Sequence, residues 1–354
     1  MLLKMENKTR NSNIELLRIV LMTCILCWHV LVHGYGFANI GNEGFHYRLN
    51  VPLTLVLSCL LVPATYTFVF ISGYFGLHFH WRKFVELILG CIVVSVCGSI
   101  FLYSQGRNDI IDLWRSFFPI YPQGCWWFMT VYIWLYMLSP LIDEGISLLD
   151  QRKLRNLVLL FSLFLSVGIL AMQKSVGSDL GGVLTIYLIG RYMRLYHSLS
   201  QKQAMKVYCV SLVLMLIIIF GLWLGLNKFS HYSAYKGLFY FLSFCNPLII
   251  SMSVGIFFLV YKLPTWSNPI FNKIASGSLF IYLITEKLGL GWGYIYEPLA
   301  KILDKNIMHG CVLILLLVII CLLAGCVIQY CVHCLTGVAI SNFKRIIEKM
   351  NYNI

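Results

Sequence analysis

Glu15, Arg18 and His29 are ionisable side chains inside one long apolar segment near the start of the chain. Each costs at least a few kcal/mol to place in hydrocarbon, so a segment that keeps all of them is expected to use them. Arg18 and His29 are eleven residues apart, and that separation returns to within roughly 20° of the same face of a helix. We therefore predict that both point into one cavity, about 16 Å apart along the helix axis.

These residue types suit proton transfer and anion binding. An imidazole titrates near neutral pH, so His29 can act as a general base, while Arg18 can hold a phosphate or a carboxylate. Glu15 precedes Arg18 by three residues and is expected to pair with it and fix its guanidinium. Two alternatives stay open: Arg18 reaches the membrane surface only to keep its charge in water, and His29 is a hydrogen-bonded core histidine.

The composition indicates a membrane protein. Of the 354 residues, 59% are hydrophobic and only 12% are charged, and the mean hydropathy is +0.80, whereas a soluble chain carries charges on roughly a quarter of its residues. The net charge of +13 comes from basic residues in short loops between apolar runs. This distribution is typical of residues that set the orientation of membrane helices, and we expect no nucleic-acid partner. The 13 cysteines lie mostly inside apolar runs and predict no disulfide framework.

Apolar stretches long enough to cross a hydrocarbon core of about 30 Å predict about ten transmembrane helices, and hence an all-α, polytopic membrane helix bundle. The whole chain, 1–354, is expected to form one integral membrane domain, with a short cytoplasmic N-terminal arm (1–13) and an interfacial C-terminal tail (336–354). The predicted spans are roughly 14–35, 51–76, 84–104, 126–142, 156–172, 180–196, 205–226, 237–261, 271–290 and 310–334.

The distribution of Lys and Arg predicts the orientation of the bundle. With the N-terminus in the cytoplasm, about 17 of these residues fall on the inner side and about 9 on the outer side, as the positive-inside rule requires. An even number of spans then places both termini in the cytoplasm. Arg82 and Lys83 fall on the inner side in this arrangement.

Several segments resemble the acyltransferase 3 family of membrane proteins. Arg18, ten intervening residues and then His29 is the spacing that marks the family, and the string Asn11-Ser-Asn-Ile-Glu-Leu-Leu-Arg18 with the later His33-Gly34 pair resembles its capsule-type acetyltransferases. The resemblance covers nearly the whole chain. Further matching segments are Phe70-Ile-Ser-Gly-Tyr-Phe75, Trp126-Trp-Phe128 through Leu138-Ser-Pro140, Ile186-Tyr-Leu-Ile-Gly190, and Asn272 to Ile284.

The last of these segments departs from the family pattern. After Ile284 the family commonly has a histidine, whereas this chain continues with Thr285 and Glu286. Either the histidine is dispensable, or one of these two residues supplies a substitute polar group.

The resemblance implies a membrane O-acyltransferase of a bacterial cell membrane. It implies an acyl-CoA donor, with acetyl-CoA as a co-substrate and no bound cofactor, and as acceptor a sugar hydroxyl of a surface polysaccharide or of its lipid-linked precursor. His29 is then the general base or a transient acyl carrier, Arg18 and Glu15 belong to the catalytic group, and Arg18, Arg82 and Lys83 meet the CoA phosphates.

The matching segments also supply candidate substrate-binding residues. Each has a structural alternative, namely close helix packing, an aromatic belt at the membrane surface or a helix end marked by Pro140. The candidates are Ser72, Tyr74, Trp126, Trp127, Tyr132 and Glu286.

Competing functions are a transporter or flippase for a lipid-linked sugar, and an acyltransferase of this family with a different acceptor. Polar groups inside a helix bundle also mark translocation paths, but neither an inverted repeat nor a pair of broken helices is evident in the sequence. We expect no metal site, because Cys331, His333 and Cys334 have no fourth ligand nearby. The sequence sets no oligomeric state.

Overall fold

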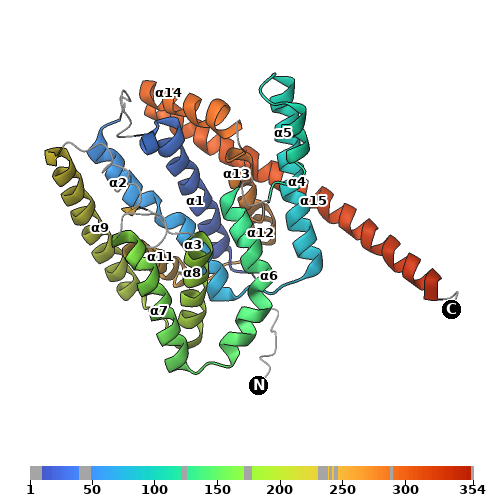
Figure 1. Ribbon diagram of the computed structural model, residues 1–354, viewed down its shortest axis with the longest axis horizontal. Coiled ribbons are helices and arrows are strands. Elements are labelled where there is room, and N and C mark those ends of the chain that lie inside the picture. Colours follow the sequence, from blue (N-terminus) through green and yellow to red (C-terminus); the bar gives the residue numbers. More distant parts are fainter. Residues whose placement is uncertain are drawn as a thin grey trace.

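The computed structural model describes residues 10–39, 49–120, 126–170, 178–229, 238, 241–242, 246–287 and 290–351. Within these residues the chain is helical and contains no strand, which confirms the predicted all-α bundle (Figure 1). Most of the predicted arm, and the first part of the predicted span 237–261, lie outside the described residues. The helices are α1 (Ser12–His29), α2 (Val51–Leu61), α3 (Pro63–Phe75), α4 (Trp81–Ser104), α5 (Ile110–Arg115), α6 (Trp127–Ser147), α7 (Gln151–Leu170), α8 (Ser178–Tyr196), α9 (Gln201–Phe229), α11 (Pro247–Tyr261), α12 (Pro269–Ala275), α13 (Ser278–Thr285), α14 (Glu297–Lys305) and α15 (Ile307–Asn351).

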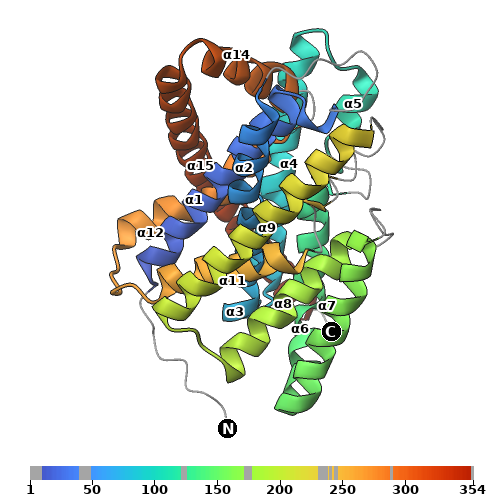
Figure 2. The same cartoon turned by 90° about the vertical axis from the view of Figure 1, so that its left-hand side faces the viewer.

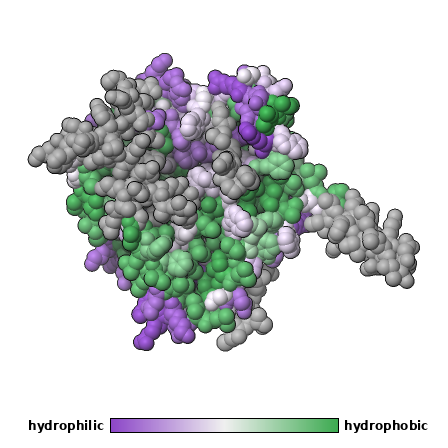
Figure 3. Space-filling view, in the orientation of Figure 1, coloured by the Kyte–Doolittle hydropathy of each residue, from purple (hydrophilic) through white to green (hydrophobic). Residues whose placement is uncertain are grey.

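Five helical segments of the described chain are long and apolar enough to cross a membrane. Hydrophobic residues cover the middle of the face seen in Figure 3, and hydrophilic residues gather at its two ends. The total of about ten spans stays a prediction. The five segments are Ser12–Gly34, Val51–Phe75, Trp81–Ser104, Gln201–Gly225 and Ile307–Val338.

Two predicted spans are broken rather than continuous. The span 51–76 divides at Val62, because Pro63 has no backbone N–H to continue the helix. The span 271–290 divides into α12 and α13, and there the free carbonyl of Ser276 accepts a hydrogen bond of 2.9 Å from Gln329 of α15. In contrast, Pro140 does not end α6, which continues to Ser147.

The last span and the C-terminal tail form one helix. α15 runs without a break for 45 residues, about 68 Å at 1.5 Å per residue, which is more than twice the thickness of a hydrocarbon core. Figure 1 shows its second half leaving the bundle. The interfacial position of the tail stays a prediction.

α1 runs through the bundle in contact with α2, α3, α11, α12 and α13, and Figure 2 shows α12 beside its beginning. The Asn11-Ser-Asn13 string ties this end of α1 to the segment before and within α12. Ser12 Oγ donates to Asn272 Oδ1 at 2.7 Å, and Trp266 Nε1 donates to Asn13 Oδ1 at 2.7 Å. These buried polar residues therefore fix the position of α1, which carries the candidate catalytic side chains.

α3 and α8 pack unusually closely, and two glycines of the family-like segments allow it. A Cβ on Gly73 would lie 2.5 Å from the carbonyl oxygen of Tyr187, and a Cβ on Gly190 would lie 2.7 Å from the backbone nitrogen of Tyr74. Small residues bring membrane helices into backbone contact in this way. Close helix packing, one of the structural alternatives given for the matching segments, is thus the role that the structure shows for Gly73.

Candidate active site

His29 is the last residue of α1, and its imidazole lies against the C-terminal end of α13. Its Nδ1 is 2.9 Å from Oε1 of Glu286, and both side chains are only 13% exposed. The hydroxyl of Tyr296 donates a hydrogen bond to the same carboxylate oxygen. A carboxylate at Nδ1 favours the tautomer that carries its proton there, which leaves Nε2 as the nitrogen that can accept a proton.

Two π-helical turns bring these residues together: η1 (Val30–Gly34), which follows His29, and η3 (Gly291–Tyr296), between α13 and α14. The two turns pack against each other. π-helical turns occur frequently at functional sites. Here the ring of His33 stacks on that of Trp292, with centroids 4.7 Å apart, and on that of Tyr296 at 5.7 Å.

Gly34 makes the contact of η1 with η3 possible. A Cβ at this position would lie 2.5 Å from the carbonyl oxygen of Tyr296 and 3.2 Å from Cβ of Ala300. A larger residue would push η3 away, and with it Tyr296, which bonds to Glu286. The His33-Gly34 pair noted in the sequence thus has a structural role beside the candidate base.

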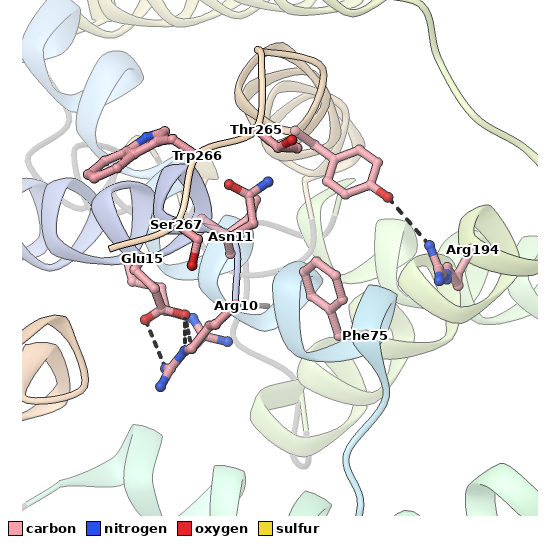
Figure 4. Close-up of a pocket in the computed structure, with 11 residues that line it drawn as sticks. Arg10, Asn11, Glu15, Phe75, Arg194, Thr265, Trp266 and Ser267 are labelled. Atoms are coloured by element: carbon pink, nitrogen blue, oxygen red, sulfur yellow. Dashed lines mark hydrogen bonds and ion pairs between the residues drawn. The ribbon is translucent and has the colours of Figure 1, made fainter. Parts of the chain in front are cut away.

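The opposite end of α1 borders a cavity of about 700 Å³, shown in Figure 4. Three arginines and three aromatic residues are among those that line it, so it offers positive charge and aromatic side chains. His29 is not among the residues that line it, so this cavity does not bring Arg18 and His29 together as expected. The lining residues are Arg10, Asn11, Ile14, Glu15, Arg18, Phe75, Arg194, Tyr261, Thr265, Trp266 and Ser267.

Glu15 holds two of these arginines. The predicted pair with Arg18 is confirmed, with Nη1 of Arg18 3.2 Å from Oε1 of Glu15. Arg10, which the sequence did not single out, contacts both oxygens of the same carboxylate, at 2.7 and 2.9 Å (Figure 4). Because Glu15 is 2% exposed and engaged by two guanidinium groups, its geometry suits positioning of these groups rather than contact with a substrate.

Arg194 of α8 faces the same cavity (Figure 4). Its guanidinium lies 5.2 Å from the ring centroid of Tyr74 and within 3.5 Å of the Tyr261 hydroxyl. Tyr74, predicted to bind substrate, therefore lies beside this cavity, in the last turn of α3. The helix ends at Gly76, which has a positive φ of 81°.

The remaining substrate-binding candidates lie on α3 and α6. The hydroxyls of Ser72 and Tyr132 are 3.3 Å apart and join the two helices. Trp126 is fully buried, while Trp127 is 37% exposed at the beginning of α6. Phe128 stacks on Tyr132 and contacts Tyr282, whose ring centroid is 6.4 Å from that of His29. Tyr132 is thus connected to His29 through the rings of Phe128 and Tyr282.

Arg82 and Lys83 do not line the cavity. Nε of Arg82 is 2.9 Å from Oε1 of Glu86, and its Nη2 lies 3.0 Å from the imidazole of His333 on α15. Lys83 is exposed. A role for this pair in binding CoA stays a prediction without a contact that supports it.

Sequence reasoning missed Arg10, Arg194 and Tyr296, and it left the partner of Glu286 open. Arg10 precedes Glu15 by five residues, outside the helix spacings that predict side-chain pairs. The spacing of Tyr296 and Glu286, ten residues with a π-helical turn between them, matches no regular period. One signal was available, because Glu286 is an acidic residue at the position where the family commonly has a histidine.

Among the described residues, no group of three or more His, Cys, Asp or Glu side chains is arranged to hold a metal ion. Comparison with known proteins gives one family match: a family model described as an acyltransferase domain matches residues 11–328. No curated protein and no solved structure matches the chain.

Proposed function

The chain belongs to the acyltransferase 3 family of membrane proteins, and on that basis we propose that it transfers an acetyl group from acetyl-CoA to a sugar hydroxyl of a bacterial surface polysaccharide or its lipid-linked precursor. The observation that carries the proposal is the contact between His29 and Glu286, at 2.9 Å. An imidazole held by a carboxylate is the arrangement that enzymes use to take a proton from a hydroxyl nucleophile.

In the proposed reaction, Nε2 of His29 takes the proton of the sugar hydroxyl while the sugar oxygen attacks the thioester carbonyl. A C–O bond forms, the C–S bond breaks, and the departing thiolate takes the proton from the imidazolium and leaves as free CoA thiol. Glu286 stabilises the transient positive charge on His29. A positioned general base of this kind contributes about 10²- to 10⁴-fold in rate.

The cavity at the beginning of α1 suits the donor. Arg10, Arg18 and Arg194 line it, and planar guanidinium groups bind phosphate oxygens in pairs. Trp266 offers a face on which an adenine ring can stack. With the phosphates held there, the pantetheine arm has to extend along α1 by about 16 Å, the rise from Arg18 to His29, to bring the thioester to the base. The cavity lies on the side that the basic residues predict to be cytoplasmic, where acetyl-CoA is made.

The proposal is tested by comparing the surface glycans of cells with and without the protein by mass spectrometry. We expect acetyl mass increments on a sugar that disappear in the deletion and return with the wild-type chain. The His29→Ala variant should not restore them, although it is inserted in the membrane in normal amounts. His309→Ala removes an exposed histidine of α15 and serves as the matched control, with full restoration. Wild-type acetylation by His29→Ala would show that His29 is only a core histidine.

A further inference from the structure

The end of the bundle opposite the donor cavity carries an aromatic surface that the proposed mechanism does not use. α5 and α14 are both at this end (Figure 1), and η3 leads directly into α14. Trp292 of η3 is 56% exposed, although its ring stacks on that of His33. From Trp292, a continuous series of contacts runs through His33 and Tyr296 to Glu286 and so to His29.

An arginine lies next to this surface, and it has no counter-ion among the residues that the structure describes. The guanidinium carbon of Arg107, in the loop after α4, is 4.7 Å from the ring centroid of Tyr294. Its Nη1 lies so close to the backbone of η3 that a Cβ on Gly293 would be 2.7 Å away. In the described part of the chain, Arg107 forms no ion pair and no side-chain hydrogen bond, so its N–H donors remain for a ligand.

We propose that Trp292 and Arg107 form the binding site for the acyl acceptor, and that this acceptor is an acidic saccharide. The apolar C–H face of a sugar ring packs on the indole of Trp292, and the anionic group of the same or the neighbouring sugar, a carboxylate or a phosphodiester, binds the guanidinium of Arg107. This inference rests on the proposed acetyl transfer and adds the chemical class of its acceptor.

The chemistry of the two side chains supports this assignment. Binding sites for small polar molecules combine aromatic walls with a few placed polar groups, and a tryptophan presents a large, stiff apolar face. Arg107 is held over Tyr294, so its planar fork is already oriented, and a guanidinium binds carboxylate and phosphate oxygens in pairs. Arg107 is exposed, so its guanidinium is accessible to a bound saccharide. Its hydrogen bonds to a carboxylate or a phosphodiester are stronger than those to a neutral hydroxyl, which favours acidic acceptors.

A tryptophan at the end of a membrane bundle can also be a simple interfacial anchor. Trp114 of α5 provides the comparison, because it lies at the same end of the bundle and is 66% exposed. An anchoring role predicts that both tryptophans are equivalent in activity assays. The proposed site predicts that only Trp292 affects the acceptor.

The test uses the purified full chain in lipid nanodiscs, radiolabelled acetyl-CoA, and unacetylated glycan extracted from deletion cells. The glycan is used untreated, after chemical reduction of its carboxylates to alcohols, and after hydrofluoric acid cleavage of its phosphodiesters. We expect one of the two treatments to raise the acceptor KM about tenfold or more. If reduction raises the acceptor KM, the recognised anion is a carboxylate. If acid cleavage raises it, the anion is a phosphodiester.

Variants then connect the charge to the residues. Arg107→Gln should raise the KM for untreated glycan about tenfold and have no effect on the preparation that lost the anion. Trp292→Ala should raise the acceptor KM, whereas Trp292→Phe should have an acceptor KM close to that of the wild type. Trp114→Ala should leave the acceptor KM unchanged. The KM for acetyl-CoA should not change in any of them.

Equal kinetics with all three glycan preparations would overturn the acidic acceptor while leaving acetyl transfer intact, as would an unchanged acceptor KM in Arg107→Gln. Equal behaviour of Trp292→Ala and Trp114→Ala would reduce Trp292 to an anchor. If the wild-type chain acetylates none of the preparations, the proposed function itself fails, and the acceptor site with it.

Discussion

Replacing Glu286 with glutamine tests the contact on which the proposed chemistry depends. The substitution keeps the shape of the side chain but removes its charge. Glu286 now accepts from Tyr296 and lies 2.9 Å from Nδ1 of His29. A glutamine can turn its NH₂ group toward Nδ1, which moves the imidazole proton to Nε2 and removes the base. It also removes the negative charge that stabilises the imidazolium.

We expect kcat for Glu286→Gln to fall about 10²- to 10⁴-fold, which corresponds to about 3 to 5 kcal/mol of activation free energy. The KM for acetyl-CoA should stay the same, because the arginines that line the donor cavity lie near the other end of α1. The assay is acetyl transfer from radiolabelled acetyl-CoA to unacetylated glycan by purified protein, normalised to the amount of monodisperse protein in detergent.

Glu297→Gln is the matched control, since Glu297 is the exposed first residue of α14 and pairs with Lys301. We expect this variant to retain wild-type kcat. A merely structural role of Glu286 would lower the yield of folded protein but not the kcat of the molecules that fold. A wild-type kcat for Glu286→Gln would refute the view that this carboxylate orients His29.

Four further predictions concern the donor side, the packing of the site and the topology. Arg18→Lys should raise the KM for acetyl-CoA about tenfold, because lysine lacks the planar fork; an unchanged value would leave only a point charge at this position. Arg194→Ala should raise the same KM. If Arg82 and Lys83 assist CoA binding, the double variant Arg82→Ala plus Lys83→Ala should bind CoA more weakly in titration calorimetry. Unchanged binding would mean that these two residues determine topology only. Gly34→Ala should lower the free energy of unfolding by about 1 to 3 kcal/mol, because the added methyl group meets a backbone carbonyl. The melting temperature of the detergent-solubilised protein should fall accordingly, and an equal melting temperature would contradict the close approach of η1 and η3. Reporter fusions should place both termini in the cytoplasm, and a periplasmic signal from either end would reverse the orientation.

The features of this protein that are local in sequence could be predicted from it. Hydropathy identified the apolar segments, because the bilayer requires long uncharged helices regardless of their partners. The spacing of Glu15 and Arg18 predicted their ion pair, since residues three apart are neighbours on any helix. His29 was a functional candidate because a polar side chain is costly to bury in an apolar helix.

The partners of these residues depend on the tertiary structure. Glu286 is 257 positions after His29 in the chain, and the two meet only because α13 ends beside the end of α1. The breaks in the spans 51–76 and 271–290 likewise depend on what packs against them, since the carbonyl of Ser276 is satisfied by Gln329 from another helix. A sequence determines which segments enter the membrane, because that is a property of each segment and its solvent. Which side chains form a site is decided by contacts between helices, and these arise only when the whole bundle packs.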